Sequence, residues 1–465
     1  MRLGSFRRWA VVLGLATLML STVTIPASAS GNVKVNVLLN TDITDAHLAE
    51  LRGYGLVKGT LIEINAVFMQ VKADRVDDVA ALPFVEAVSP DAERQGVPID
   101  TVAATNFENG INTWDQDAIN VTNFGMGRTI GANADGAGVY VAVLDTGLLY
   151  SWRQYFPQER IATQFAKSFG GGGSEQANVS EQPGKWESDT NSHGTHVTST
   201  ILGYSLGGTP INGVAPQATV IPVKVLGNSG SGSSGMVAAG ITYIGSLKAP
   251  GGPLAGSPVV INMSLGGPEL DAVEKAAIDY AIAQGVIIVA SAGNNGTDGM
   301  GFPGAYAPVI SVAASGWVGE WLPAGNNGWW NNRDVADPTN PDHFYITDFS
   351  SRELTEQDLD IAAPGSWVVG PYQLQQGKIS YFFLGGTSMS SPHVAGTVAL
   401  MAQKVNGLNA SQAETILTDS AIPLGAGCRD VVPIPGQPAA EICWGADATG
   451  AGLLDAAAAV AATTP

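Results

Sequence analysis

A serine stands between a glycine-rich turn and a predicted helix in the segment Gly385-Gly386-Thr387-Ser388. The two glycines allow a tight turn of the backbone. The helix is predicted from apolar residues at a spacing of about 3.6, namely Val394, Val398 and Met401. Unpaired N–H groups at a helix N-terminus favour the negative charge that develops when a serine attacks a carbonyl. Ser388 is therefore a candidate nucleophile, but such a turn alone is more often an ordinary capped helix, and the assignment requires a base.

Five histidines are available as that base. Two are poor candidates because they lie in a small N-terminal segment and in a polar loop, namely His47 and His343. His393 follows Ser388 by five positions on the same helix, which directs it away from the serine. His193 begins a further predicted helix, whereas His196 is expected to pack or to cap. His193 is therefore the predicted base.

Nearly continuous apolar and β-branched runs indicate buried parallel strands. They cover residues 138–144, 219–226, 259–263, 286–290 and 309–314, with helical patterns between them at 236–247 and 270–284. This alternation predicts an α/β fold, a doubly wound and mostly parallel sheet flanked by helices, with ligands outside the carboxyl ends of the strands. Polar or glycine-rich residues follow several strands at that edge, including Asp145, Ser264 and Asn294.

The first 29 residues have the pattern of a secretory signal peptide. A basic start precedes an apolar stretch, and Ala27-Ser28-Ala29 fits a cleavage site, so export to the extracellular medium is expected. An uncleaved membrane anchor is the alternative. No later segment approaches the roughly 18 to 20 unbroken apolar residues of a membrane span.

Three further regions follow the signal. Residues 30–94 alternate as strand, helix, strand, helix and strand, at 33–39, 45–54, 61–71, 74–82 and 84–88, which predicts a small α+β domain. Residues 95–112 are a polar linker without clear periodicity, and residues 113–465 form the large domain.

Charge and cysteine content limit the possible partners. A formal net charge of −19 argues against nucleic acids and anionic membranes, although it is compatible with calcium. The two cysteines, Cys428 and Cys443, flank a loop rich in proline and glycine and are expected to pair in an exported protein. Two free thiols remain the alternative. A catalytic metal is not expected, because His193 and His196 lack the third ligand and the glutamate of a zinc-peptidase helix.

Three segments together resemble the signature motifs of the subtilisin-like serine peptidases, the subtilases, in that family's order. They are Asp145-Thr146-Gly147, His193-Gly194-Thr195-His196-Val197 and Gly386-Thr387-Ser388-Met389-Ser390-Ser391-Pro392-His393. The resemblance extends from about residue 114 to the C-terminus. It implies that Ser388 is the nucleophile, His193 the general base and Asp145 the group that orients the imidazole. It also implies that Asn294 donates to the oxyanion, together with the backbone N–H of Ser388.

The same resemblance implies how substrate is bound. Gly230-Ser231-Gly232 and Ser264-Leu265-Gly266 are similar to the two edges that hold an extended peptide. Gly301 lies in a segment like the base of the primary specificity pocket, so a large apolar or aromatic residue is expected before the cleaved bond. Residues 30–94 resemble the family's inhibitory propeptide, whose tail lies in the active site until it is cut; a permanently attached accessory domain is the alternative. The cut is expected between residues 90 and 112.

Two regions depart from the family pattern. The loop at 207–212 lacks the asparagines of a strong calcium site, so structural calcium is possible but its ligands are unassigned. The segment 317–334 looks like an insertion and contains Trp317, Trp321, Trp329 and Trp330. It could extend the cleft or bind a polymer, but packing against the main body is expected.

Together these patterns predict a secreted serine endopeptidase, made as a self-processed zymogen, that hydrolyses polypeptides through an acyl-enzyme and needs no cofactor for its chemistry. One alternative is a catalytically silent binding protein of the same fold, and another is an exopeptidase. The joint presence of Asp145, His193, Ser388 and Asn294 favours the endopeptidase.

Overall fold

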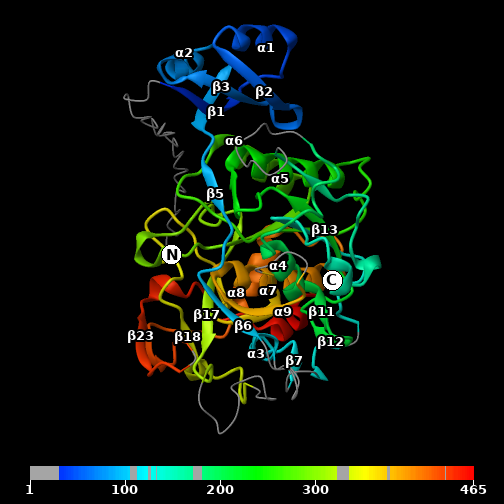
Figure 1. The fold of residues 1–465 in the computed structure, drawn as a ribbon, viewed down its shortest axis with the longest axis vertical. Coiled ribbons are helices and arrows are strands. Elements are labelled where there is room, and N and C mark those ends of the chain that lie inside the picture. Colours follow the sequence, from blue (N-terminus) through cyan, green and yellow to red (C-terminus); the bar gives the residue numbers. More distant parts are fainter. Residues whose placement is uncertain are drawn as a thin grey trace, which may run out of the picture.

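The computed structural model describes residues 31–104, 113–123, 127–131, 133–170, 181–321, 335–373, 378–434 and 436–464. The predicted signal peptide lies outside these residues. Figure 1 shows a small N-terminal part beside a larger part that is built around a central sheet. None of the helices in the described ranges is long and apolar enough to cross a bilayer.

The central sheet confirms the predicted α/β fold. Its strand order is β10-β13-β9-β15-β16-β17-β18, and β19 also pairs with β17. The strands are β9 (Tyr140–Asp145), β10 (Lys167–Ser168), β13 (Thr219–Lys224), β15 (Val259–Met263), β16 (Val286–Ser291), β17 (Ile310–Trp317), β18 (Phe344–Ile346) and β19 (Ile361–Pro364). All pairs are parallel except β17 with β18. The five predicted strands are all present, and their ends agree within two residues except that β17 runs three residues further than expected.

Helices cover both faces of the sheet, which explains why its strands are apolar on both sides. On one face α4 (His193–Leu202) and α7 (Thr387–Lys404) pack together, and on the other α5 (Ser234–Lys248) packs against α6 (Ala272–Ala283). Asp271 begins α6 by accepting hydrogen bonds from the N–H groups of Val273 and Glu274. The other described α-helices of the large part are α3 (Trp114–Ala118), α8 (Ala410–Asp419) and α9 (Ala456–Ala462).

The N-terminal part has one strand more than the sequence pattern predicted. Its elements are β1 (Asn32–Leu39), α1 (Asp45–Arg52), β2 (Gly55–Leu61), β3 (Ala66–Lys72), α2 (Val76–Ala80) and β4 (Val85–Pro90). The single strand expected at 61–71 is wrong, because a 3₁₀ turn and the left-handed Asn65 divide the region into the hairpin of β2 and β3. The strand β2 carries glycine and lysine and has no apolar alternation, so its pairing was not visible in the sequence.

The predicted linker is also partly ordered as strands. The short strand β5 (Glu93–Gln95) pairs with β14 (Ser231–Ser233), and β6 (Asp100–Ala104) pairs with β21 (Tyr381–Gly385), which pairs in turn with β20 (Val368–Pro371). Figure 1 shows β5 leaving the N-terminal part and crossing the larger one. Strands that are held by backbone hydrogen bonds need no apolar periodicity, so a polar composition did not reveal them.

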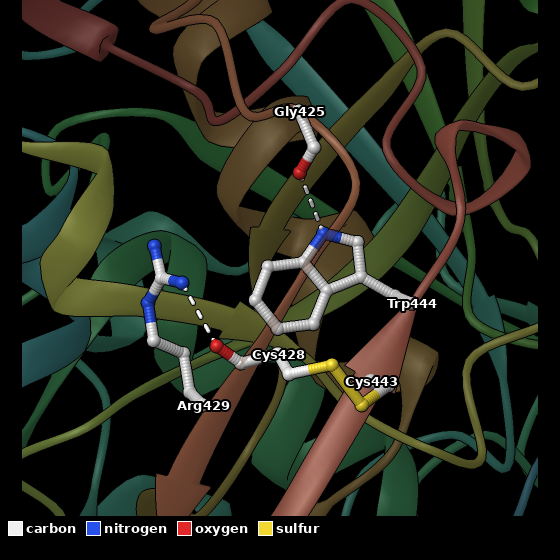
Figure 2. The surroundings of a disulfide bond; sticks show 5 residues. All are labelled: Gly425, Cys428, Arg429, Cys443 and Trp444. Carbon is white, nitrogen blue, oxygen red and sulfur yellow. Dashed lines mark hydrogen bonds between the residues drawn. A yellow bond between two sulfur atoms is a disulfide. The ribbon is translucent and has the colours of Figure 1, made fainter.

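The two cysteines form the expected disulfide. Cys428 and Cys443 face each other in the hairpin of β22 (Gly427–Val431) and β23 (Ala440–Trp444). Beside it the indole N–H of Trp444 donates to the carbonyl of Gly425 at 2.9 Å (Figure 2). The disulfide and this hydrogen bond fix the hairpin and the turn before it.

Two of the four tryptophans in the 317–334 segment are described, and both pack against the main body. Trp317 stacks on Trp114, and Trp321 meets Trp367 and Phe383 edge-on. Trp329 and Trp330 lie outside the described residues.

We expect the double substitution Cys428→Ser and Cys443→Ser to lower the free energy of unfolding by about 3 kcal/mol. The disulfide closes a loop of 15 residues, and its removal restores the freedom of that loop in the unfolded chain. Urea unfolding of the variant and of the parent measures the difference. A midpoint that does not move would show that the hairpin is held by its packing alone.

Glu320 allows a second test, in which the free energy of unfolding is measured as a function of pH. Its carboxylate accepts hydrogen bonds from the Trp317 N–H and from the hydroxyls of Tyr345 and Ser366, and burial raises its pKa to about 8. A carboxyl with a raised pKa favours the folded state fully below its unfolded value of 4.5. That contribution is lost as the pH rises through the folded value.

We therefore expect Glu320→Gln to flatten the decline in stability between pH 5 and about 8. Above that range the variant should gain stability relative to the parent, because glutamine has no charge that must be kept away from water. Urea unfolding at several pH values measures this, with Glu159→Gln at an exposed site as the control. An unchanged slope would contradict the assignment.

Candidate active site

The candidate nucleophile is placed by the start of α7. Gly386 precedes the helix with a φ of 152°, and the side chain of Ser388 is buried. The Ser388 hydroxyl donates to the carbonyl of Ser264 at 3.2 Å, while the Ser264 hydroxyl donates to the carbonyl of Ser388 at 2.8 Å. These two bonds join the first turn of α7 to the segment that follows β15.

His193 is the first residue of α4 and is held by Asp145 at the end of β9. Its Nδ1 lies 2.9 and 3.0 Å from the two carboxylate oxygens of Asp145, and neither side chain is exposed. Because the carboxylate accepts, Nδ1 carries the proton and Nε2 keeps its lone pair. Nε2 is buried and has no hydrogen-bond partner among the described residues. An imidazole in this state is ready to accept a proton.

Sequence reasoning missed the polar network behind this pair. The Thr146 N–H donates to Asp145, and its hydroxyl donates to Asp189 while accepting the N–H of Gly194. Asp189 also accepts the N–H of Ser192, and burial raises the pKa of Asp189 to about 6. The signal that could have revealed it is an aspartate just before the predicted helix, a position where carboxylates accept nearby backbone N–H groups.

Asn294 follows β16 and faces the start of α7. Its amide oxygen accepts both the N–H and the hydroxyl of Thr387, each at 2.9 Å. The oxygen is thereby committed, so the amide nitrogen is left to donate. Asn294 and Ser388 line one cavity, where this nitrogen can reach a negative oxygen formed beside the serine.

The remaining histidines take the places that were expected of them. His196 lies 3.1 Å through Nε2 from the carbonyl of Val368, and burial lowers its pKa to about 3, so it packs as a neutral ring. His393 contacts the Met389 carbonyl and, through Nε2, a carboxylate oxygen of Asp115 at 3.0 Å. Both rings are therefore engaged away from Ser388.

The two predicted substrate edges enclose β5 of the chain itself. Gln95 exchanges two backbone hydrogen bonds with Gly266, of 2.9 and 3.0 Å, and Gly96 donates to the carbonyl of Gly230 at 2.9 Å. On the Gly230 side, Gly232 lies in register with Arg94. Both edges therefore hold an extended peptide as an added strand.

This segment passes directly beside His193, one of the candidate catalytic residues. A Cβ atom added to Gly96 would lie 3.4 Å from Cε1 of His193. Two residues beyond Val97, the N–H of Ile99 donates to the carbonyl of Gly385 at 2.7 Å. Val97 is thus the residue presented to the site, and the chain continues on both sides of it.

A cavity of about 320 Å³ opens next to Val97. Its lining includes Leu265, Gly266, Ser291 and Gly301 as well as Ser388 and Asn294. A side chain at position 301 would enter this space and contact the backbone of Gly267 at 3.4 Å, so glycine keeps the cavity open.

One acidic cluster could bind a cation. Carboxylate oxygens of Asp358, Asp360 and Glu414 lie within 4.8 Å of one another. Burial raises the pKa of Asp360 to about 7, and one of its oxygens already accepts from the N–H and hydroxyl of Ser311. The sequence had not indicated these residues.

Several known proteins resemble this chain in sequence or in fold. The profile of the subtilase family matches residues 136–454. Subtilisin DY of Bacillus licheniformis is 33% identical over 294 residues, which are 62% of this chain and 86% of that protein. An extracellular protease of Xanthomonas campestris pv. campestris is 30% identical over 382 residues, covering 77% of this chain and 60% of that protein. The crystal structure of fervidolysin from Fervidobacterium pennivorans shares the fold, with a TM-score of 0.65, 22% identity and coverage of 95% of this chain and 63% of fervidolysin.

We expect Asp145→Asn to disturb the tautomer of His193. The introduced amide can donate to Nδ1, which moves the ring proton to Nε2 and removes the acceptor that Ser388 would need. Nitrogen chemical shifts of the ring report the tautomer. Labelling of Ser388 by a fluorophosphonate should slow by roughly 10³- to 10⁴-fold relative to the parent prepared in the same way. Unchanged shifts together with unchanged labelling would contradict this role of Asp145.

Proposed function

Because this chain belongs to the subtilase family and is a serine endopeptidase, we propose that Ser388, His193, Asp145 and Asn294 perform its catalysis. The observation that carries the proposal is the buried Nε2 of His193. It lacks a partner among the described residues, while Nδ1 is fixed by Asp145 beside a cleft that holds an extended peptide.

In the proposed reaction Ser388 Oγ attacks the peptide carbonyl, and its proton passes to Nε2 of His193. Asp145 stabilises the charged imidazole, and the oxyanion accepts from the Asn294 amide and the Ser388 N–H. His193 then gives the proton to the leaving amine, which departs and leaves an acyl-enzyme. Water hydrolyses the ester by the same steps, with His193 again as base. These steps need no cofactor, and calcium at Asp358, Asp360 and Glu414 would be structural.

Residues 30–94 are the intramolecular inhibitor in this proposal, and residues 95–112 contain the processing site. The position of β5 between the two substrate edges supports this, because no substrate can pair there while β5 remains. With the signal at 1–29 the protein is secreted as a zymogen. Its partners are polypeptides, and neither nucleic acid nor membrane is among them.

The cavity at Gly301 supports a preference for a large apolar or aromatic residue before the cleaved bond. Val97 leaves about 320 Å³ of it unfilled. Endopeptidase action also agrees with the path of residues 93–99, because the chain runs through the cleft and continues beyond it in both directions. The cleft of an exopeptidase would be blocked at one end. A silent binding protein would have no use for a histidine whose Nδ1 is fixed by Asp145 and whose buried Nε2 is left unbonded among the described residues.

The test is Ser388→Ala. This change removes the nucleophile and leaves the cleft intact, so secreted precursor should remain uncut and hydrolysis of casein should fall by roughly 10⁴-fold or more. Mass spectrometry of the secreted chain and release of labelled casein fragments measure the two effects. Thr415→Ala, on the distant helix α8, is the matched control and should mature normally. Maturation and casein cleavage by Ser388→Ala would overturn the proposal.

A further inference from the structure

Arg94 is the most enclosed charged side chain of the segment that fills the cleft. It belongs to β5, three residues before Val97, and none of its surface is exposed. An arginine is rarely buried without compensation. Its surroundings therefore show what this part of the cleft is built to bind.

All three nitrogens of the Arg94 guanidinium donate to acceptors. Its Nε lies 3.1 Å from one carboxylate oxygen of Glu274, and an Nη contacts the other, which makes a two-point ion pair. Further bonds reach the carbonyls of Glu269 at 2.7 Å and Glu93 at 2.9 Å. Burial opposes the charge, but Glu274 outweighs it and holds the pKa of Arg94 above its ordinary value.

The wall around this guanidinium belongs to the large part of the chain. Glu274 lies in the first turn of α6 and is itself completely buried. Gly267 completes the recess, because a Cβ atom there would lie 2.6 Å from an Nη nitrogen of Arg94. A carboxylate in a recess that a side chain would block matches the fork geometry of arginine.

The recess stays with the enzyme after β5 has left. Glu274 then keeps its position on α6 but has lost its ion-pair partner, so the recess presents an unpaired carboxylate to whatever peptide enters the cleft. We propose that Glu274 and Gly267 form a substrate subsite that selects arginine at the fourth residue before the cleaved bond, counting the residue at the bond as the first. This inference rests on the proposed function, which makes Val97 the residue at the bond.

Internally quenched peptides test the subsite on the mature enzyme secreted from cells that express the full chain. They carry the sequence X-Gln-Gly-Phe-Ala, in which X is Arg, Lys, Gln or Glu and Phe fills the apolar cavity. We expect kcat/KM for Arg to exceed that for Gln by roughly 10- to 100-fold. Lys should fall between them because it cannot make the two-point contact, and Glu should be poorest.

Glu274→Gln should bring the Arg-to-Gln ratio of kcat/KM close to one. Asp279→Asn is the matched control, because it removes an equal charge from an exposed site on the same helix and should leave the ratio unchanged. If Glu274→Gln does not mature, the comparison of kcat/KM for the Arg and Gln peptides on the parent enzyme still tests the subsite. A second measurement is inhibition by a peptide with the sequence of residues 91–99, which should weaken at least 10-fold when its arginine is replaced by alanine.

The outcomes separate this inference from the proposed function. Cleavage after Phe with equal rates for Arg and Gln overturns the subsite and shows that the Arg94–Glu274 pair serves the precursor alone. Absence of cleavage of every peptide, or a cut at another bond, contradicts the proposed function or its register instead. Mass spectrometry of the products locates the cut.

Discussion

Parallel pairing of β9, β15 and β16 is the constraint on which the site depends. Neighbouring parallel strands end at the same edge of a sheet, so the residues that follow them are brought together without further contacts. Asp145 ends β9, Ser264 follows β15, and Asn294 follows β16. The helix α7 packs against these strands and presents Ser388 at the same edge. The arrangement of the candidate catalytic residues is thus set largely by the sheet.

The strands of the central sheet could be predicted from the sequence, because both of their faces are buried and their residues are therefore mostly apolar. β9 is apolar up to its last residue, Asp145, and β15 is apolar except for Asn262. Polar or glycine-rich residues mark where each strand ends. Ser388 and His193 could be named because each stands at the start of a predicted helix, and the resemblance to the subtilase motifs assigned the roles of all four candidate catalytic residues. β2, β5 and β6 could not be predicted, because backbone hydrogen bonds hold them and their side chains show no periodicity.

Contacts between distant residues were also hidden. Arg94 and Glu274 are 180 positions apart, and nothing in either local sequence marks them as a pair. Asp189 likewise has the sequence context of a loop residue, and only the fold shows that it accepts a hydrogen bond from the Thr146 hydroxyl. In both cases the carboxylate matters because it is buried. A charge that is removed from water must be compensated by nearby hydrogen-bond donors or by an opposite charge. Burial of single side chains is set by tertiary packing and is the property least visible in a linear pattern.

The continuity of β5 and β6 through the cleft bears on how long the proposed inhibition would last. While the chain is intact, the segment that fills the cleft is tethered at both ends, so its effective concentration at the site is on the order of millimolar or higher and does not change on dilution. A single break between the two strands would leave β6 paired with β21, whereas β5 would depart with the N-terminal part. After the break, occupancy of the cleft would depend on the concentration of the released N-terminal fragment. Dilution into a large extracellular volume would lower that concentration and leave the cleft empty.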